Sequence, residues 1–312
     1  MRPIVFEPIF MERVWGGRRL EELLGKPLPP AKKIGESWEI VDRPEGQSVV
    51  RQGPLKGKTL HELWSDHRPE IFGTGMPNSP RFPLLGKLLD ASEMLSLQVH
   101  PPVDVAQSLG GEPKGELWYF IATEPGAEIF AGLRAGVRRE QFADALQNGR
   151  IPDLLHRLTL RAGESFFVPS GRLHGLGAGN VVVEIQQNSD TTYRVFDWNR
   201  QDGPGRRRHL HIAESMRAIC FDDHEPAPIQ AKGEELLRCP HFIVEKWEIA
   251  GERPALLEPR FALFVCLDGK IAVRDEVFRP GDFFLVPASG QKTVLHSLGD
   301  NSAALRITLP AR

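Results

Sequence analysis

Residues 161–171 read RAGESFFVPSG, and residues 279–290 read RPGDFFLVPASG. Each stretch carries a basic residue, a Gly turn, an acidic residue, an aromatic-rich apolar run, and then Pro before a turn of small residues. A short apolar run bounded by Gly and Pro is typical of a β-strand. Finding the same strand-and-turn unit twice in one chain predicts two copies of one β domain.

The rest of the chain favours the same fold class. Its 312 residues include 30 Gly and 26 Pro, spread between short apolar or alternating runs. We therefore predict an all-β protein of two β-sandwich or β-barrel domains, covering residues 1–230 and 238–312. A small helical insertion is expected near 138–158, because residues 139–147 and 151–158 show helical spacing of apolar side chains.

Composition excludes several classes of partner. The 39 basic and 41 acidic residues leave a net charge of -2, so electrostatics gives no reason to expect nucleic acid or an anionic membrane. No apolar run approaches the length of a membrane span, and the first residues do not resemble a signal peptide. The 3 cysteines are widely spaced and are expected to be free thiols. We expect a cytoplasmic protein of open oligomeric state, monomer or dimer.

The two copies of the repeat differ where the turn ends. The first continues to His174, whereas the second continues into residues 291–293 (QKT) and has no histidine there. The spacing of Gly163, Pro169, Gly171 and His174 resembles the second motif of the cupin superfamily, in which this histidine is a metal ligand. The resemblance implies two cupin (jelly-roll β-sandwich) domains, of which the first binds a metal and the second is degenerate.

The first cupin motif usually supplies H-x-H and then a Glu. The matching residues here are Gln98, His100 and, after a long insertion, Glu116. Residues i and i+2 of a strand point to the same face, so Gln98 and His100 can share one cavity. Two imidazoles, a carboxylate and an amide oxygen suit Zn²⁺, although Fe²⁺, Mn²⁺ or Co²⁺ would accept the same ligand types.

Longer blocks of the sequence make the resemblance more specific. The chain is similar to the short bacterial form of the type I mannose-6-phosphate isomerases over the first two-thirds of its length, and only loosely, as a degenerate cupin, in the final third. The matching segments are RVWGG (13–17), IGESWEI (34–40), FPLLGKLLDASEMLSLQVHPP (82–102), KGELWYF (114–120), FFVPSGRLHGLG (166–177) and EIQQNSDTTYRVFDWNR (184–200).

The resemblance implies a metal-dependent aldose–ketose isomerase that interconverts mannose 6-phosphate and fructose 6-phosphate through an enediol or enediolate. It implies one zinc ion per chain, held by Gln98, His100, Glu116 and His174, and a small sugar phosphate as the partner. A Lewis acid and a fixed guanidinium would both stabilise the charge that builds up on the substrate oxygens.

The resemblance also assigns pocket residues. Arg194 matches an arginine thought to stabilise the enediolate, and Lys114 matches a pocket lysine with a catalytic role. Further substrate-binding positions are implied at Lys87, Ser96, Trp15, Glu36 and Asp190. The proton-transferring base is open among Lys114, Glu36 and a metal-bound water.

Two rival functions are compatible with the same residues. One is a cupin isomerase or epimerase acting on another sugar or sugar phosphate. The other is a metal-containing cupin that only binds sugar, although the chain carries no recognisable output domain. Two other groups are expected to have no role in the site: Glu184 and Gln186 as scaffold, and the arginines at 206–208 as a solvated loop.

Overall fold

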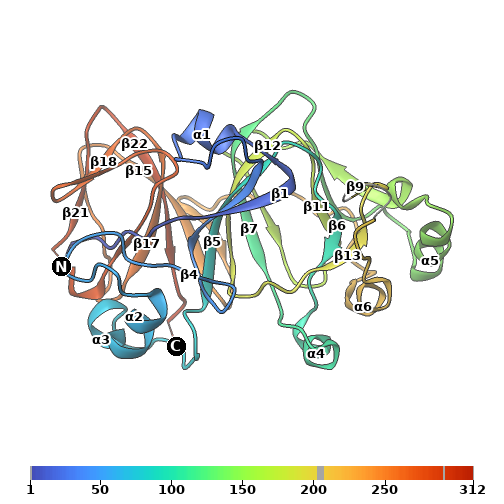
Figure 1. The fold of residues 1–312 in the computed structure, drawn as a ribbon, viewed down its shortest axis with the longest axis horizontal. Helices are drawn as coiled ribbons and strands as arrows, with labels where there is room; N and C mark the ends of the chain where they lie inside the picture. Colours follow the sequence, from blue (N-terminus) through green and yellow to red (C-terminus); the bar gives the residue numbers. More distant parts are fainter. Residues whose placement is uncertain (1, 202–206, 291, 312) are drawn as a thin grey trace.

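The computed structural model describes residues 2–201, 207–290 and 292–311, and it confirms the all-β prediction. Two β-sandwiches lie side by side, and few helices accompany them (Figure 1). The first sandwich pairs a six-stranded sheet with a five-stranded one. The six strands, in spatial order, are β1 (Ile9–Gly17), β2 (Ile34–Ile40), β5 (Leu84–Ala91), β12 (Asn180–Gln187), β7 (Glu116–Thr123) and β10 (Ser165–Val168). The five strands are β13 (Tyr193–Phe196), β6 (Leu97–Val99), β11 (His174–Leu176), β8 (Ile129–Leu133) and β9 (Leu155–Leu158).

The second sandwich is built in the same way from the C-terminal part of the chain. Its five-stranded sheet has the order β14 (Glu235–Arg238), β15 (Ile243–Ile249), β22 (Ser302–Thr308), β17 (Ala262–Asp268) and β20 (Phe283–Val286). Its four-stranded sheet has the order β16 (Glu252–Pro254), β21 (Val294–Ser297), β18 (Ile271–Val273) and β19 (Glu276–Phe278). A separate ribbon pairs β3 (Asp42–Arg43) with β4 (Gly46–Gln47).

The six-stranded sheet is buried on both faces. In β12, Val182 packs into the interior of the first sandwich, whereas its neighbours Val181 and Val183 join a second apolar cluster. That second cluster also contains Val244 and Leu305 of the second sandwich. The stretch Val181–Val183 is therefore continuously apolar, as expected for a strand covered on both sides.

The N-terminal segment links the two sandwiches. Ile4 forms backbone hydrogen bonds in both directions with Leu285 of β20, at the edge of the second sandwich. Val5 is buried in the interior of that sandwich beside Trp247. The division into domains at residues 1–230 and 238–312 stays our proposal, and the first few residues pack against the second sandwich.

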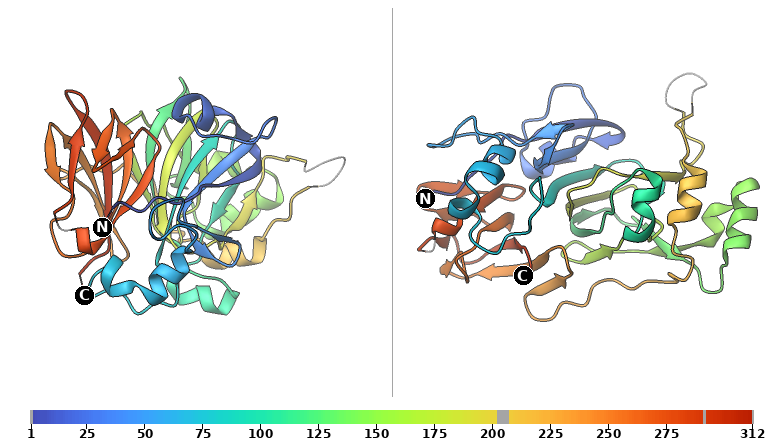
Figure 2. Two further views of the ribbon diagram at one scale, coloured as in Figure 1. Left: turned by 60° about the vertical axis from the view of Figure 1, so that its left-hand side comes forward. Right: turned by 90° about the horizontal axis from the view of Figure 1, so that it is seen from below.

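The helices are short and lie at the periphery (Figure 2). They are α1 (Arg19–Leu24), α2 (Leu60–Asp66), α3 (Arg68–Ile71), α4 (Val103–Ala106), α5 (Arg139–Gln147) and α6 (Ile212–Ala218). Three 3₁₀ turns accompany them at Gln107–Leu109, Ile151–Leu154 and Ala288–Gly290. Helix α2 begins at a capping box between Thr59 and Glu62, and its Trp64 packs against Phe72 and Phe82. No helix of the described residues is long and apolar enough to cross a membrane.

The helical insertion is only partly as predicted. Helix α5 covers Arg139–Gln147, but the second expected helix, residues 151–158, is a 3₁₀ turn followed by strand β9. Leu155–Leu158 pairs with β8 and is therefore extended, so only Ile151–Leu154 forms a helical turn.

Candidate metal centre and active-site cavity

Three predicted ligands converge inside the first sandwich. His100, Glu116 and His174 are fully buried, and one ligand atom from each lies within 4.8 Å of the others. His100 Nε2 is 3.4 Å from Glu116 Oε2, and His174 Nε2 is 3.4 Å from Glu116 Oε1. The two histidines come from the β6 and β11 side and the glutamate opens β7, so the two sheets of the sandwich supply ligands from opposite sides.

Backbone carbonyls orient both imidazoles. His100 Nδ1 lies 2.9 Å from the carbonyl oxygen of Thr191, and His174 Nδ1 lies 2.8 Å from that of Arg172. Protonated Nδ1 atoms would donate to these carbonyls and leave each Nε2 lone pair facing Glu116. Among the described residues, His100 Nε2 and Glu116 Oε1 have no hydrogen-bond partner although both are buried. Buried polar atoms normally have partners, so a bound cation fits this set of donors.

Gln98 lies beside the three ligands. It pairs across the sheet with His174, and its side-chain Nε2 is 3.3 Å from His174 Nε2. Rotating the amide would present an oxygen at the same place, because the two ends of a glutamine amide are nearly the same size. The predicted four-residue set is thus brought together, with Gln98 at its edge facing the cavity.

The protonation states of the cluster suit cation binding. Burial, reinforced by the neighbouring His100, lowers the pKa of His174 to about 3. Burial and Lys114 also lower the pKa of His100. Burial alone would raise the pKa of Glu116, but Lys114 and the imidazoles outweigh it and hold that pKa well below its usual range. Two neutral imidazoles and one carboxylate are the forms that bind metals.

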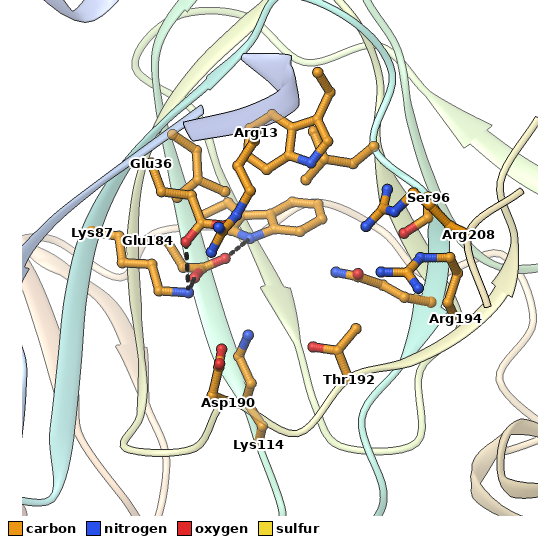
Figure 3. Close-up of a pocket in the computed structure, with 15 residues that line it drawn as sticks. Arg13, Glu36, Lys87, Ser96, Lys114, Glu184, Asp190, Thr192, Arg194 and Arg208 are labelled. Atoms are coloured by element: carbon orange, nitrogen blue, oxygen red, sulfur yellow. Dashed lines mark hydrogen bonds and ion pairs between the residues drawn. The ribbon is translucent and has the colours of Figure 1, made fainter. Parts of the chain in front are cut away.

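A cavity of about 360 Å³ adjoins the cluster (Figure 3). Gln98 and Lys114 belong to its wall, and Lys114 Nζ is 2.9 Å from Glu116 Oε2, so the cavity reaches the buried ligands. All the predicted substrate-binding and catalytic side chains line it, namely Trp15, Glu36, Lys87, Ser96, Lys114, Asp190 and Arg194.

One wall of the cavity is a network of paired charges (Figure 3). Glu36 accepts hydrogen bonds from Arg13 Nε at 2.9 Å and from Trp38 Nε1 at 2.6 Å. Lys87 Nζ lies 3.2 Å from Glu184 and 3.7 Å from Glu36. Burial opposes ionisation of Glu36, but Lys87 and Arg13 outweigh it and lower its pKa to about 2. Burial likewise opposes the charge on Lys87, yet Glu184 and Glu36 raise its pKa.

The opposite wall carries Ser96, Arg194 and Arg208 (Figure 3). Arg194 Nη1 donates to the carbonyl oxygen of His209 at 2.9 Å, and Arg208 Nη1 lies 3.5 Å from Asp197. Across the whole cavity lining there are more cations than carboxylates: Arg13, Lys87, Lys114, Arg194 and Arg208 against Glu36, Glu184 and Asp190. The excess of positive charge suits an anionic ligand.

Several cavity residues were not expected from the sequence. Glu184 was expected to be scaffold, but its carboxylate lines the cavity, held by Lys87 and by a 3.0 Å hydrogen bond from Trp118 Nε1. Burial and the negative charge of Glu116 raise the pKa of Glu184. Glu184 lies in the cavity because the pairing of β12 with β5 sets it opposite Lys87. The alternation of residues along one strand does not reveal this pairing.

The arginine run also needs correction. Arg208 lines the cavity, so the prediction of a wholly solvated loop is wrong for this residue, whereas Arg207 is exposed. Position 206 lies outside the described residues. Arg13 was missed too, although it stands two positions before Trp15 on the same strand, a spacing that places both on one face.

Comparisons with known proteins agree on one group of enzymes. Residues 5–123 match the sequence model of the phosphomannose isomerase type I catalytic domain. The chain is 37% identical to the mannose-6-phosphate isomerase ManA of Bacillus subtilis, covering 91% of this chain and 93% of that protein. It is 38% identical to the mannose-6-phosphate isomerase of Streptococcus mutans, covering 90% and 92%. The crystal structure of the mannose 6-phosphate isomerase from Bacillus subtilis superposes with a TM-score of 0.88 at 34% identity, over 99% of this chain and 100% of that one.

Proposed function

Because this chain belongs to the type I mannose-6-phosphate isomerase family, we propose that it interconverts mannose 6-phosphate and fructose 6-phosphate through an enediolate. The main support for the proposal is that two features of the structure lie next to each other. A buried cluster of His100, Glu116 and His174 adjoins a cavity with an excess of cationic side chains. A sugar phosphate needs both, one for its reacting end and one for its phosphate.

The reacting end of the sugar would lie beside the ligand cluster. Moving a proton between C1 and C2 builds negative charge on the substrate oxygens. The Arg194 guanidinium, fixed by its hydrogen bond to the His209 carbonyl, offers that charge a preorganised donor. Lys114 Nζ lies between Glu116 and the cavity, where it can hold a proton close to C1 and C2.

Glu36 is poorly suited to be the base. Its pKa of about 2 and its contacts with Arg13, Trp38 and Lys87 keep it ionised and fully engaged. We assign it to positioning the cavity wall. Lys87 is engaged in the same network, so the phosphate is better served by Ser96 and Arg208 on the opposite wall, with Trp15 and Asp190 completing the cavity.

The metal proposed for the cluster is one Zn²⁺ per chain. His100, Glu116 and His174 would hold it, with Gln98 as a fourth donor, and nitrogen and carboxylate donors of this kind suit zinc. Bound there, zinc would supply the Lewis acidity needed to polarise a sugar oxygen. The three cysteines at 220, 239 and 266 are free, which supports a cytoplasmic setting, and we propose that location.

A coupled assay for fructose 6-phosphate formed from mannose 6-phosphate tests the function. We expect turnover that chelator abolishes and that added Zn²⁺ restores. Parallel assays with glucose 6-phosphate and with unphosphorylated mannose should show much slower reaction, since the first has the wrong configuration at C2 and the second lacks the phosphate. Saturable sugar binding without exchange of the C2 proton with solvent would instead identify a binding protein.

A further inference from the structure

The second sandwich keeps a cavity at the position that corresponds to the active site of the first. The repeated motif aligns β10 with β20, so Val168 corresponds to Val286. Val168 pairs with Glu116, and Val286 pairs with Ala262. The strand that carries the ligand glutamate in the first sandwich thus carries alanine in the second.

The other ligand positions have also changed. His174 follows the first motif at the position that Thr293 takes after the second. Within the described residues, the second sandwich gathers no group of His, Cys, Asp or Glu side chains fit to hold a metal. A cavity of about 210 Å³ nevertheless remains, lined by Arg238, Glu245, Arg260, Arg306 and Thr308 among others.

A buried ion pair beside this cavity has its charges reversed relative to the first sandwich. In β12 Glu184 pairs across the sheet with Lys87, and their charged atoms are 3.2 Å apart. The corresponding partners in the second sandwich are Arg306 and Glu245, 2.5 Å apart. The equivalence is fixed by register, because Glu184 lies opposite Trp118 and Arg306 lies opposite Phe264 in the matching strands. The central strand therefore presents a cation where the active site has a carboxylate.

Three arginines and two glutamates line the second cavity, and Arg238 is paired with Glu235 beside it at 2.6 Å. The side chains of Arg306 and Arg260 are only 9% and 15% exposed, whereas Glu258, the partner of Arg260 at 3.7 Å, is 64% exposed. The Nε atoms of both arginines are buried and have no hydrogen-bond partner among the described residues. Buried guanidinium donors without acceptors are costly unless an anion accepts from them.

We propose that this cavity of the second sandwich binds a phosphomonoester group. Arginine guanidinium groups offer two parallel N–H donors that match phosphate oxygens, and the hydroxyl of Thr308 adds a further donor. The site is separate from the active-site cavity, since the two share no lining residue. The second sandwich has thus exchanged metal binding for anion binding at the same place in the fold.

Calorimetric titration of the full chain with inorganic phosphate, at constant ionic strength, tests the proposal. We expect saturable binding that is weakened about tenfold or more in the double variant Arg238→Gln/Arg260→Gln. The single variant Arg238→Gln, whose side chain is 59% exposed, guards against a folding defect and should weaken binding in the same direction.

Three controls distinguish phosphate binding in this cavity from binding elsewhere on the protein and from non-specific attraction of anions. Arg253→Gln removes a cation from the same sandwich outside the cavity, and Arg208→Gln removes the cation assigned to the phosphate in the active site; both should leave binding of phosphate in the second cavity unchanged. Malonate, a dicarboxylate, should bind more weakly than phosphate. The proposal is overturned if the cavity variants bind phosphate normally, if Arg253→Gln weakens binding equally, or if malonate binds as tightly.

Discussion

His174 and Arg194 lie on the two strands that pair with β6, one on each side of Gln98. We expect them to have different roles. We predict that His174→Ala loses both bound metal and turnover, because it removes one of three ligands from a buried cluster. Arg194→Ala should retain the metal and lose about a hundredfold or more in kcat, the usual effect of removing a donor to developing charge. Metal content by elemental analysis and kcat by the coupled assay check both. Normal turnover in Arg194→Ala would show that its guanidinium is not catalytic.

Glu36 should make folding stability depend on acid. Its folded pKa of about 2 lies below the ordinary 4.5, so its stabilising contribution is present above pH 4.5 and is lost as the pH falls towards 2. The size of the shift corresponds to about 3 kcal/mol. Glu36→Gln should flatten the decline in the free energy of unfolding across that window, as measured by denaturant titration at several pH values. An unchanged pH profile would contradict the assignment.

For individual residues, the sequence predicts the candidate metal ligands better than it predicts the residues that line the cavity. His100, Glu116 and His174 are recognisable because metal binding demands particular residue types at fixed points of a repeated motif. Arg208 and Glu184 carry no such signature. Their place in the cavity depends on the course of a loop and on strand register, and both arise from the fold as a whole.

Strands β1 and β2 pack unusually closely, and this packing positions the β1 residues that line the cavity. A Cβ atom at Gly16 would lie 2.3 Å from the backbone nitrogen of Gly35, so only glycine allows the two strands to pack this closely. Gly16→Ala should force β1 away and displace Arg13 and Trp15 from the cavity. We expect a loss of about 1–3 kcal/mol in stability together with a raised KM.

Thermal unfolding and steady-state kinetics measure the two effects of Gly16→Ala. Gly299→Ala is the matched control, because no atom lies within 4 Å of a Cβ added there. Equal behaviour of the two variants would show that the close approach is not needed.

The predictions of secondary structure were right where the spacing of apolar residues and the flanking turn residues indicated the same element. Strand β10 (Ser165–Val168) lies within the repeated motif that predicted a strand, and helix α5 (Arg139–Gln147) has the predicted bounds. The prediction of a helix at residues 151–158 was wrong, because the spacing of apolar residues alone does not distinguish a short helix from a turn that leads into a strand. Pairing with β8 decided that segment, and such long-range pairing is not readable from local spacing.

The two sandwiches share one apolar core across their facing sheets. Leu305 of β22 is fully buried in this shared cluster together with Leu88 and Val183 of the first sandwich. We predict that Leu305→Ala costs about 2–5 kcal/mol and destabilises both sandwiches together. Calorimetry should show a single transition, shifted down in the variant, with activity lost at the same temperature. Two separate transitions would show that the sandwiches unfold independently.

The pairing of Ile4 with Leu285 joins two segments that lie far apart in the sequence. During synthesis the first residues leave the ribosome while the strand that receives them has not yet been made. The six-stranded sheet can assemble earlier, but its outer face stays uncovered until the C-terminal strands appear. The nascent chain can therefore complete its fold only after β20 and β22 have been synthesised, and until then it most needs protection from aggregation.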